Sequence, residues 1–202
     1  MEFLVTTAPE HPVGDAVVVD AVNGDHAAMD ALWREHRRWI AAVLLAHKSA
    51  EDHVEDLLQD VAMTFVSKIN TLRDTRHVRA WLRTVAVNVA RAAARSRRAR
   101  PRLAPLSVDP PAADHIGADT VAVDDEARRL MTLAARLPEA YREPLLLRAV
   151  HGMRGRQIAE IMNLAEATVE TRIARGRRML RDLARTGEFD DAAVREHYES
   201  TA

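Results

Sequence analysis

The sequence has no cysteine, few aromatic residues and no long hydrophobic run. Without cysteine, disulfide bonds and thiolate metal sites are excluded, and the composition suits a reducing compartment. No apolar stretch approaches the roughly 20 residues that a membrane-spanning helix needs. The first residues also lack the basic and apolar segments of a signal peptide. We therefore expect a cytoplasmic protein with no stable membrane insertion.

The sequence also lacks the usual signatures of catalysis. It contains no glycine-rich phosphate loop, no paired-histidine zinc motif and no nucleophile elbow. The nine histidines are scattered. One of them, His53, lies among the acidic residues Glu51, Asp52, Glu55 and Asp56. No second histidine accompanies it, so we expect no enzyme activity, no cofactor and no bound metal.

Charge is segregated along the chain although the net charge is only −1. Residues 75–108 contain nine arginines and no acidic residue, whereas residues 49–67 contain five acidic residues and no lysine or arginine. Single-sign blocks of this kind indicate at least two charged partners, one polyanionic and one basic.

Apolar residues recur at three- and four-residue spacing, which predicts amphipathic helices over residues 27–45, 54–69 and 78–98 and a weaker one over 15–22. Three tryptophans, Trp33, Trp39 and Trp81, are expected to pack in the core. A second helical block begins near residue 124. Four of the eight prolines fall in residues 101–123, which therefore predict an extended linker. The fold class expected is all-α, with two small helical domains joined by a flexible linker.

The stretch "RQIAEIMNLAEATVETRIARGRRMLR", residues 156–181, has the pattern of a helix-turn-helix. Ala159 is small enough for close helix packing, and Asn163 tolerates the positive φ that the turn requires. Val169 and Ile173 would anchor the second helix inward. That leaves an outward strip for the major groove: Glu170, Thr171, Ala174, Arg175 and Arg178. A helical hairpin with a solvated basic face is the plainer alternative.

The chain resembles the extracytoplasmic-function (ECF) branch of the bacterial sigma-70 family, the promoter-recognition subunits of RNA polymerase. The resemblance is carried by "GDHAAMDALWREH", "VEDLLQDVAMTFV", "RAWLRTVAVNVARAAARSRR" and "LPEAYREPLLLRAVHGMRGRQIAEIMNLAEATVETRIARGRRML". It implies an N-terminal extension (1–14), sigma region 2 (15–100), the linker (101–123), sigma region 4 (124–186) and an acidic tail (187–202). The implied function is to bind core polymerase and direct promoter-specific transcription initiation.

The resemblance also implies residue roles. The polymerase-binding residues would be Glu55, Asp56, Leu58, Gln59 and Asp60, which match the motif that docks on the β′ clamp. The −10 DNA contacts would be Asn70, Arg73, Arg76, Arg79, Arg83, Asn88, Arg91 and Arg95, with Arg97 and Arg98 continuing the phosphate-facing side. The −35 contacts would be Thr168, Glu170, Thr171, Arg172, Ala174, Arg175 and Arg178. Region 4 would also touch the β flap, and an anti-sigma factor is an expected partner.

One residue departs from the family pattern. Lys or Arg usually follows the valine that opens the second helix of the motif, whereas this chain has Glu170. A carboxylate near a helix N-terminus is stabilised by about 0.3–1 kcal/mol, and it can accept a hydrogen bond from cytosine N4. Our hypothesis is that Glu170 changes the −35 preference. The acidic tail is a second hypothesis, as a segment that folds back on region 4.

Two other function classes remain open from the sequence. One is a helix-turn-helix regulator that binds DNA without polymerase. The other is a helical interaction protein, such as a sigma-mimicking adaptor, without DNA contacts.

Overall fold

The computed structural model describes residues 14–99 and 132–186. In order, the elements are α1 (Asp15–Val22), α2 (His26–His47), α3 (Val54–Lys68), the 3-10 turns η1 (Ile69–Thr71) and η2 (Thr75–His77), α4 (Val78–Ala99), a helical segment at 132–135, α6 (Glu139–His151), α7 (Gly155–Met162) and α8 (Glu166–Thr186). The part of the chain that the structure describes contains no strand, which confirms the all-α prediction. The predicted linker and acidic tail lie outside the described residues.

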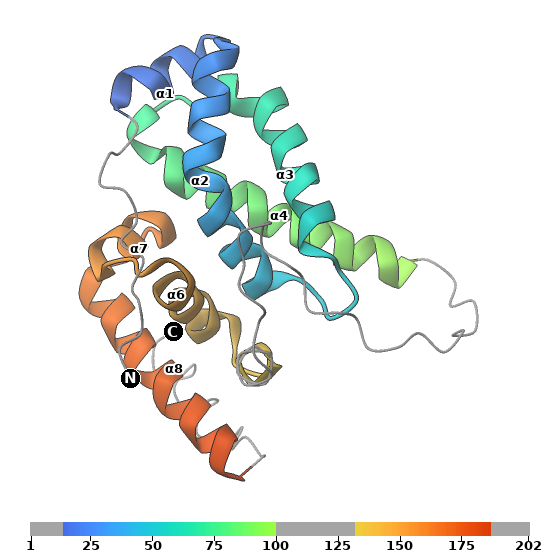
Figure 1. The fold of residues 1–202 in the computed structure, drawn as a ribbon, viewed down its shortest axis with the longest axis vertical. Coiled ribbons are helices and arrows are strands. Elements are labelled where there is room, and N and C mark those ends of the chain that lie inside the picture. The colour runs from blue at the N-terminus through green and yellow to red at the C-terminus, as the bar shows by residue number, and fades with distance from the viewer. Residues whose placement is uncertain (1–13, 100–131, 187–202) are drawn as a thin grey trace.

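The N-terminal block consists of α1–α4 (Figure 1). Its centre is an aromatic cluster in which the ring of Phe65 lies 6.0 Å from that of Trp33 and 6.4 Å from that of Trp81. Phe65 is 1% exposed, Trp39 is also buried, and the other two tryptophans are half-buried against the core. The predicted packing role of the tryptophans is confirmed. At the start of α2, the Asp25 side chain accepts a hydrogen bond from the Ala28 N–H at 2.7 Å, which caps the helix.

The C-terminal block consists of α6, α7 and α8. Pro138 precedes the first residue of α6, and the helix continues through Pro144, which removes one backbone donor without ending it. The turn after α7 has Asn163 at φ 52°, in the left-handed region. Ala159 is buried in α7, as are Val169 and Ile173 in α8. The predicted helix-turn-helix is therefore confirmed in its small residue, its turn and its anchors.

The two blocks pack against each other. Helix α6 lies along α2, and α7 lies against α4 (Figure 1). One continuous cluster of buried apolar residues includes members of both blocks, such as Val43 and Leu44 of α2 and Leu145 and Leu147 of α6. Burial of apolar surface contributes about 25 cal/mol per Å², so the shared core holds the blocks together. The expectation of two domains separated by a linker did not include this contact.

Candidate nucleic-acid interface

Three arginines of α4 face three glutamates of the C-terminal block. Arg79, Arg83 and Arg91 are four and eight residues apart, so they lie on one side of the helix. We call them the arginine row. Their partners, the glutamate row, are Glu160 of α7 and Glu143 and Glu139 of α6. The closest nitrogen–oxygen distances, in the same order, are 3.1, 2.6 and 3.7 Å.

Glu143 is the buried member of this set, with 1% of its side chain exposed. Arg83 donates to both of its oxygens, from Nε to Oε1 at 2.6 Å and from Nη2 to Oε2 at 2.7 Å. His47 Nε2 lies 2.9 Å from Oε2. Burial alone would raise the pKa of Glu143, but the hydrogen bonds from His47 and Arg83 outweigh it and lower that pKa. The hydrogen bond with Glu143 in turn raises the pKa of Arg83.

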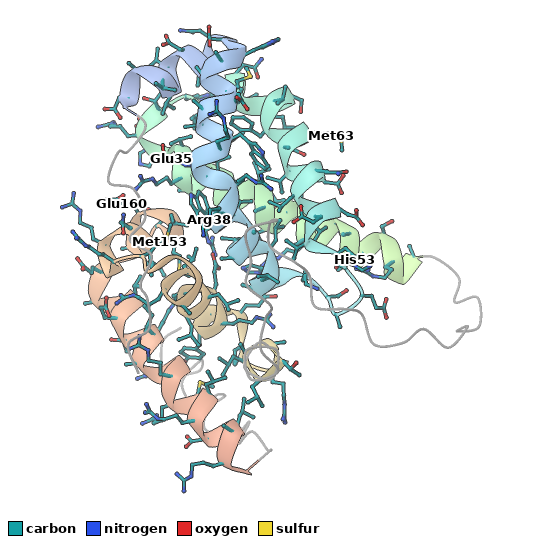
Figure 2. The ribbon with its side chains drawn as sticks, viewed as in Figure 1. Glu35, Arg38, His53, Met63, Met153 and Glu160 are labelled. Carbon is teal, nitrogen blue, oxygen red and sulfur yellow. The ribbon has the colours of Figure 1, made fainter. Side chains whose placement is uncertain are left out.

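The energies of these pairs differ because their exposure differs. Removing one partner from a buried pair leaves an uncompensated charge and costs about 3–5 kcal/mol, which is the situation at Glu143. The Arg91–Glu139 pair is about half exposed on both sides, so it contributes only about 0–1 kcal/mol. Arg79 is intermediate, since it also approaches Glu35 of α2 at 3.9 Å. Figure 2 shows Glu35 and Glu160 on the two sides of the boundary between the blocks.

Next to this boundary lies a buried histidine. His36 of α2 is 3% exposed, and its ring packs 5.6 Å from the ring of Trp39. Burial, assisted by the nearby charge of Arg79, lowers the pKa of His36 to about 4. Its Nδ1 atom has no hydrogen-bond partner among the described residues. The folded protein therefore holds this imidazole neutral at physiological pH.

The remaining predicted −10 residues are exposed. Asn70 and Arg73 lie in the loop between α3 and α4, and Asn88 and Arg95 lie on α4. Arg76 pairs with Asp74 at 2.8 Å, and the Asp74 carboxylate also accepts from the Arg76 N–H. The side-chain hydrogen bond from Arg76 lowers the pKa of Asp74 to about 2.

The predicted −10 set therefore divides into residues without a partner in the C-terminal block, which are exposed, and the arginine row, whose members pair with that block. At the far end of α4, Arg97 pairs with Asp52 instead of facing solvent. The Arg98 side chain lies outside what the structure describes.

Helix α3 presents the predicted polymerase-binding residues. Glu55, Asp56, Gln59 and Asp60 are exposed, whereas Leu58 is 5% exposed and packs in the core. Leu58 therefore supports the helix from inside. Acidic residues also line a cleft of about 340 Å³ between the start of α3 and the end of α4. Within the described ranges, no three histidine or acidic residues are placed to hold a metal ion.

Two apolar residues on α3 were not singled out from the sequence. Met63 is 63% exposed and Val66 is 56% exposed. Gln59, Met63 and Val66 are spaced by four and three residues, so they share the outer side of the helix. Figure 2 shows Met63 pointing away from the molecule. The signal available in the sequence was that both residues fall off the core-facing stripe of Leu57, Val61 and Phe65.

Helix α8 carries all the predicted −35 residues. Thr168, Glu170, Thr171, Ala174 and Arg178 are exposed, and Arg172 and Arg175 are half-buried. The Thr171 hydroxyl donates to the Ala167 carbonyl at 2.8 Å. The structure thus places an exposed strip on the second helix of the helix-turn-helix, as its pattern predicted.

Glu170 is held in place by its surroundings. Arg148 of α6 donates from Nη2 to Glu170 Oε1 at 2.5 Å. The same carboxylate lies over the first residue of α7, where a Cβ added to Gly155 would fall 2.1 Å from Oε1. Glu166 also approaches this point, at 3.2 Å from that Cβ position. The N-terminus of α7 carries a partial positive charge. Glu170, which belongs to α8, therefore stabilises α7 and also pairs with Arg148.

Within the described residues, no helix is both long enough and apolar enough to cross a membrane. A helix-turn-helix with an exposed, partly basic second helix, together with an arginine-rich helix in the other block, defines a helical nucleic-acid-binding protein.

Comparison with known families makes the class specific. The family model of sigma-70 region 2 matches residues 32–100, and that of sigma-70 region 4 matches residues 127–180. The ECF RNA polymerase sigma factor SigM of Mycobacterium tuberculosis is 30% identical over 171 residues, which cover 84% of each chain. The RNA polymerase sigma factor NccH of Alcaligenes xylosoxydans xylosoxydans is 28% identical and covers 87% of this chain and 97% of its own.

The chain belongs to the ECF branch of the sigma-70 family. It is a sigma factor that directs promoter-specific transcription initiation by RNA polymerase, and the region 2 match disfavours a regulator that acts without polymerase. The fold agrees with a solved structure described as CnrH in complex with the cytosolic domain of CnrY. That match has a TM-score of 0.58 and 22% identity over 86% of this chain and 98% of the other.

Proposed function

We propose that this sigma factor docks on core RNA polymerase through α3 and grips the promoter with two domains, residues 15–100 at the −10 element and residues 124–186 at the −35 element. The observation that carries the proposal is the exposed strip of α8 on a helix-turn-helix that matches region 4. The protein acts in the cytoplasm as a non-catalytic specificity subunit, and core polymerase performs the nucleotide chemistry.

The polymerase-docking surface is the outer side of α3. Glu55, Asp56 and Asp60 supply negative charge for a basic helix of the β′ clamp, and Gln59 supplies a hydrogen-bonding amide. Met63 and Val66 extend this surface with apolar area on the same side of the helix as Gln59. Region 4 makes the second contact, with the β flap.

Charge reversal on α3 tests this docking surface. Glu55→Lys with Asp60→Lys is expected to weaken core polymerase binding at least about tenfold, because like charges across an interface cost several kcal/mol. The matched control is Asp20→Lys with Asp30→Lys, two exposed acidic residues of α1 and α2. Equal losses in both double variants would show that only net charge matters.

The −10 element is read by the loop between α3 and α4 and by the exposed part of α4. Asn70 and Asn88 can donate and accept hydrogen bonds to bases, while Arg73, Arg76 and Arg95 neutralise phosphates. The −35 element lies against α8, with Thr171, Ala174 and Arg175 toward base edges. Binding of Glu170→Lys to a panel of −35 variants tests base reading by Glu170. A uniform gain across the panel would assign Glu170 an electrostatic effect only.

The test of the whole proposal is run-off transcription with purified core polymerase and genomic fragments. The expected result is initiation at a set of promoters that core polymerase alone does not use. An unchanged pattern of start sites would refute the proposal.

An anti-sigma factor is a further proposed partner. The CnrH structure is described as a complex with the cytosolic domain of CnrY, and CnrH of Cupriavidus metallidurans is 30% identical to this chain over 175 residues. Affinity capture of the tagged full chain from its own cells, followed by mass spectrometry, should yield such a regulator. Capture of polymerase subunits alone would count against it.

A further inference from the structure

The contact between the two blocks covers part of the surface assigned to −10 DNA. Arg79 and Arg83 are only 28% and 25% exposed in their side chains, and each is paired with a glutamate of the C-terminal block. Val87 lies on the same row, four residues after Arg83, and is 7% exposed. The C-terminal block therefore covers the part of α4 that carries Arg79 and Arg83, whereas Arg91 remains 57% exposed and meets Glu139 at 3.7 Å.

The occupant matches this surface in charge and spacing. Each arginine meets one carboxylate, and the order along α4 is reversed along the C-terminal block, from Glu160 of α7 back to Glu139 of α6. Carboxylate and phosphate oxygens accept the same hydrogen bonds from a guanidinium group. The glutamate row therefore presents to α4 the kind of anionic oxygens that a DNA backbone would present.

Glu143 makes the pairing between the two rows depend on the packing of the two blocks. Its carboxylate is buried between Arg83 of α4 and His47 of α2, and both partners belong to the N-terminal block. His47 also lies 3.2 Å from Glu139 through Nδ1. The pairing and the burial of Glu143 exist only while α6 lies against α2 and α4.

We infer that the C-terminal block is an intramolecular occupant of the −10 surface, in which the glutamate row takes the place of DNA phosphates on the arginine row. In this closed state the sigma factor has a reduced affinity for the −10 strand. Opening the contact between the blocks uncovers Arg79 and Arg83 for DNA and releases Arg91 from Glu139. The inference rests on the proposed −10 role of α4.

The absence of cysteine gives a direct test of closure in the full chain. Ser67→Cys on α3 and Ala184→Cys on α8 place spin labels at two exposed positions, one in each block. Pulsed electron paramagnetic resonance then measures the distance between them. The parent chain should give one narrow distance distribution, and Glu143→Gln should give a broader and longer one.

The same variants are tested for binding to a single-stranded oligonucleotide of the −10 non-template sequence. Glu143→Gln is expected to bind at least about tenfold more tightly, because it breaks a buried pair. Glu139→Gln with Glu160→Gln breaks pairs in which each glutamate is about half exposed, and should gain about two- to fivefold. This double variant carries the test if Glu143→Gln fails to fold, as judged by circular dichroism.

Charge-matched controls distinguish the effect of opening the contact between the blocks from the effect of a changed net charge. Asp30→Asn is the control for Glu143→Gln, and Asp20→Asn with Asp30→Asn is the control for the double variant. Neither control should change the distance or the affinity. Unchanged distances in the glutamate variants would overturn the closed state.

Longer distances with unchanged oligonucleotide affinity would overturn occlusion while leaving the promoter role intact. If no variant bound the oligonucleotide, the −10 assignment itself would fail, and occlusion with it.

Discussion

The buried imidazole of His36 makes folding stability depend on pH in a defined direction. Its pKa is about 4 in the folded protein, against about 6.5 for an unperturbed histidine. Above pH 6.5 the side chain is neutral in both the folded and the unfolded state and has no effect on stability. Between pH 6.5 and 4 the unfolded chain binds a proton that the folded chain refuses, so stability falls as the pH falls.

The size of the effect follows from the difference in pKa. One pKa unit corresponds to about 1.4 kcal/mol, so lowering the pH from 7.5 to 4 should remove about 3 kcal/mol of unfolding free energy through His36 alone. Below pH 4 both states bind the proton and the loss stops growing. For a domain with a total stability of about 5–15 kcal/mol, this is a large fraction.

The assay compares urea unfolding of the parent chain and of His36→Leu at pH 7.5, 6, 5 and 4. Other groups titrate in both proteins, so their contributions cancel in the difference. The parent should lose about 3 kcal/mol relative to His36→Leu across this range. His26→Leu, at an exposed position, is the control. If the unfolding free energies of the parent and of His36→Leu change with pH by the same amount, burial and Arg79 do not hold the imidazole neutral, and the argument is wrong.

Three further predictions concern the core and the helix-turn-helix. Phe65→Ala removes the centre of the aromatic cluster and should cost about 3–5 kcal/mol in chemical unfolding; a loss below about 1 kcal/mol would contradict its central place. Asn163→Ala should lower the unfolding free energy by about 1–2 kcal/mol because of the left-handed turn, whereas Asn163→Gly should be close to neutral. Equal effects of these two substitutions would show that φ is not the cause. Gly155→Ala should displace the Glu170 carboxylate and separate it from Arg148, and a crystal structure of the variant with that ion pair intact would refute this.

Local features of the fold could be predicted from the sequence because they depend on neighbours in the chain. The stripe on α3 that includes Leu57, Val61 and Phe65 follows from helical periodicity, and the turn at Asn163 follows from its tolerance of positive φ. The exposed strip on α8 follows from the same reasoning, since Val169 and Ile173 fix which side is buried.

The contacts between the blocks could not be predicted in this way. Arg83 and Glu143 are 60 residues apart, and Arg79 and Glu160 are 81 apart. Periodicity places each residue on a side of its own helix, but it does not say which helix covers that side. Glu170 shows the same limit, because its partner Arg148 and its neighbour Gly155 belong to α6 and α7.

With α8 on the −35 element as proposed, the arrangement around Glu170 links promoter choice to the evolution of the motif. Loss of the carboxylate at position 170 would leave Arg148 without its anion and leave Glu166 as the carboxylate near the start of α7. Variants with altered −35 preference should therefore arise with accompanying changes at positions 148 and 155, so that relatives differ at these three sites as a group. Transplanting residue 170 alone between relatives would then carry over less of the donor's preference than transplanting all three.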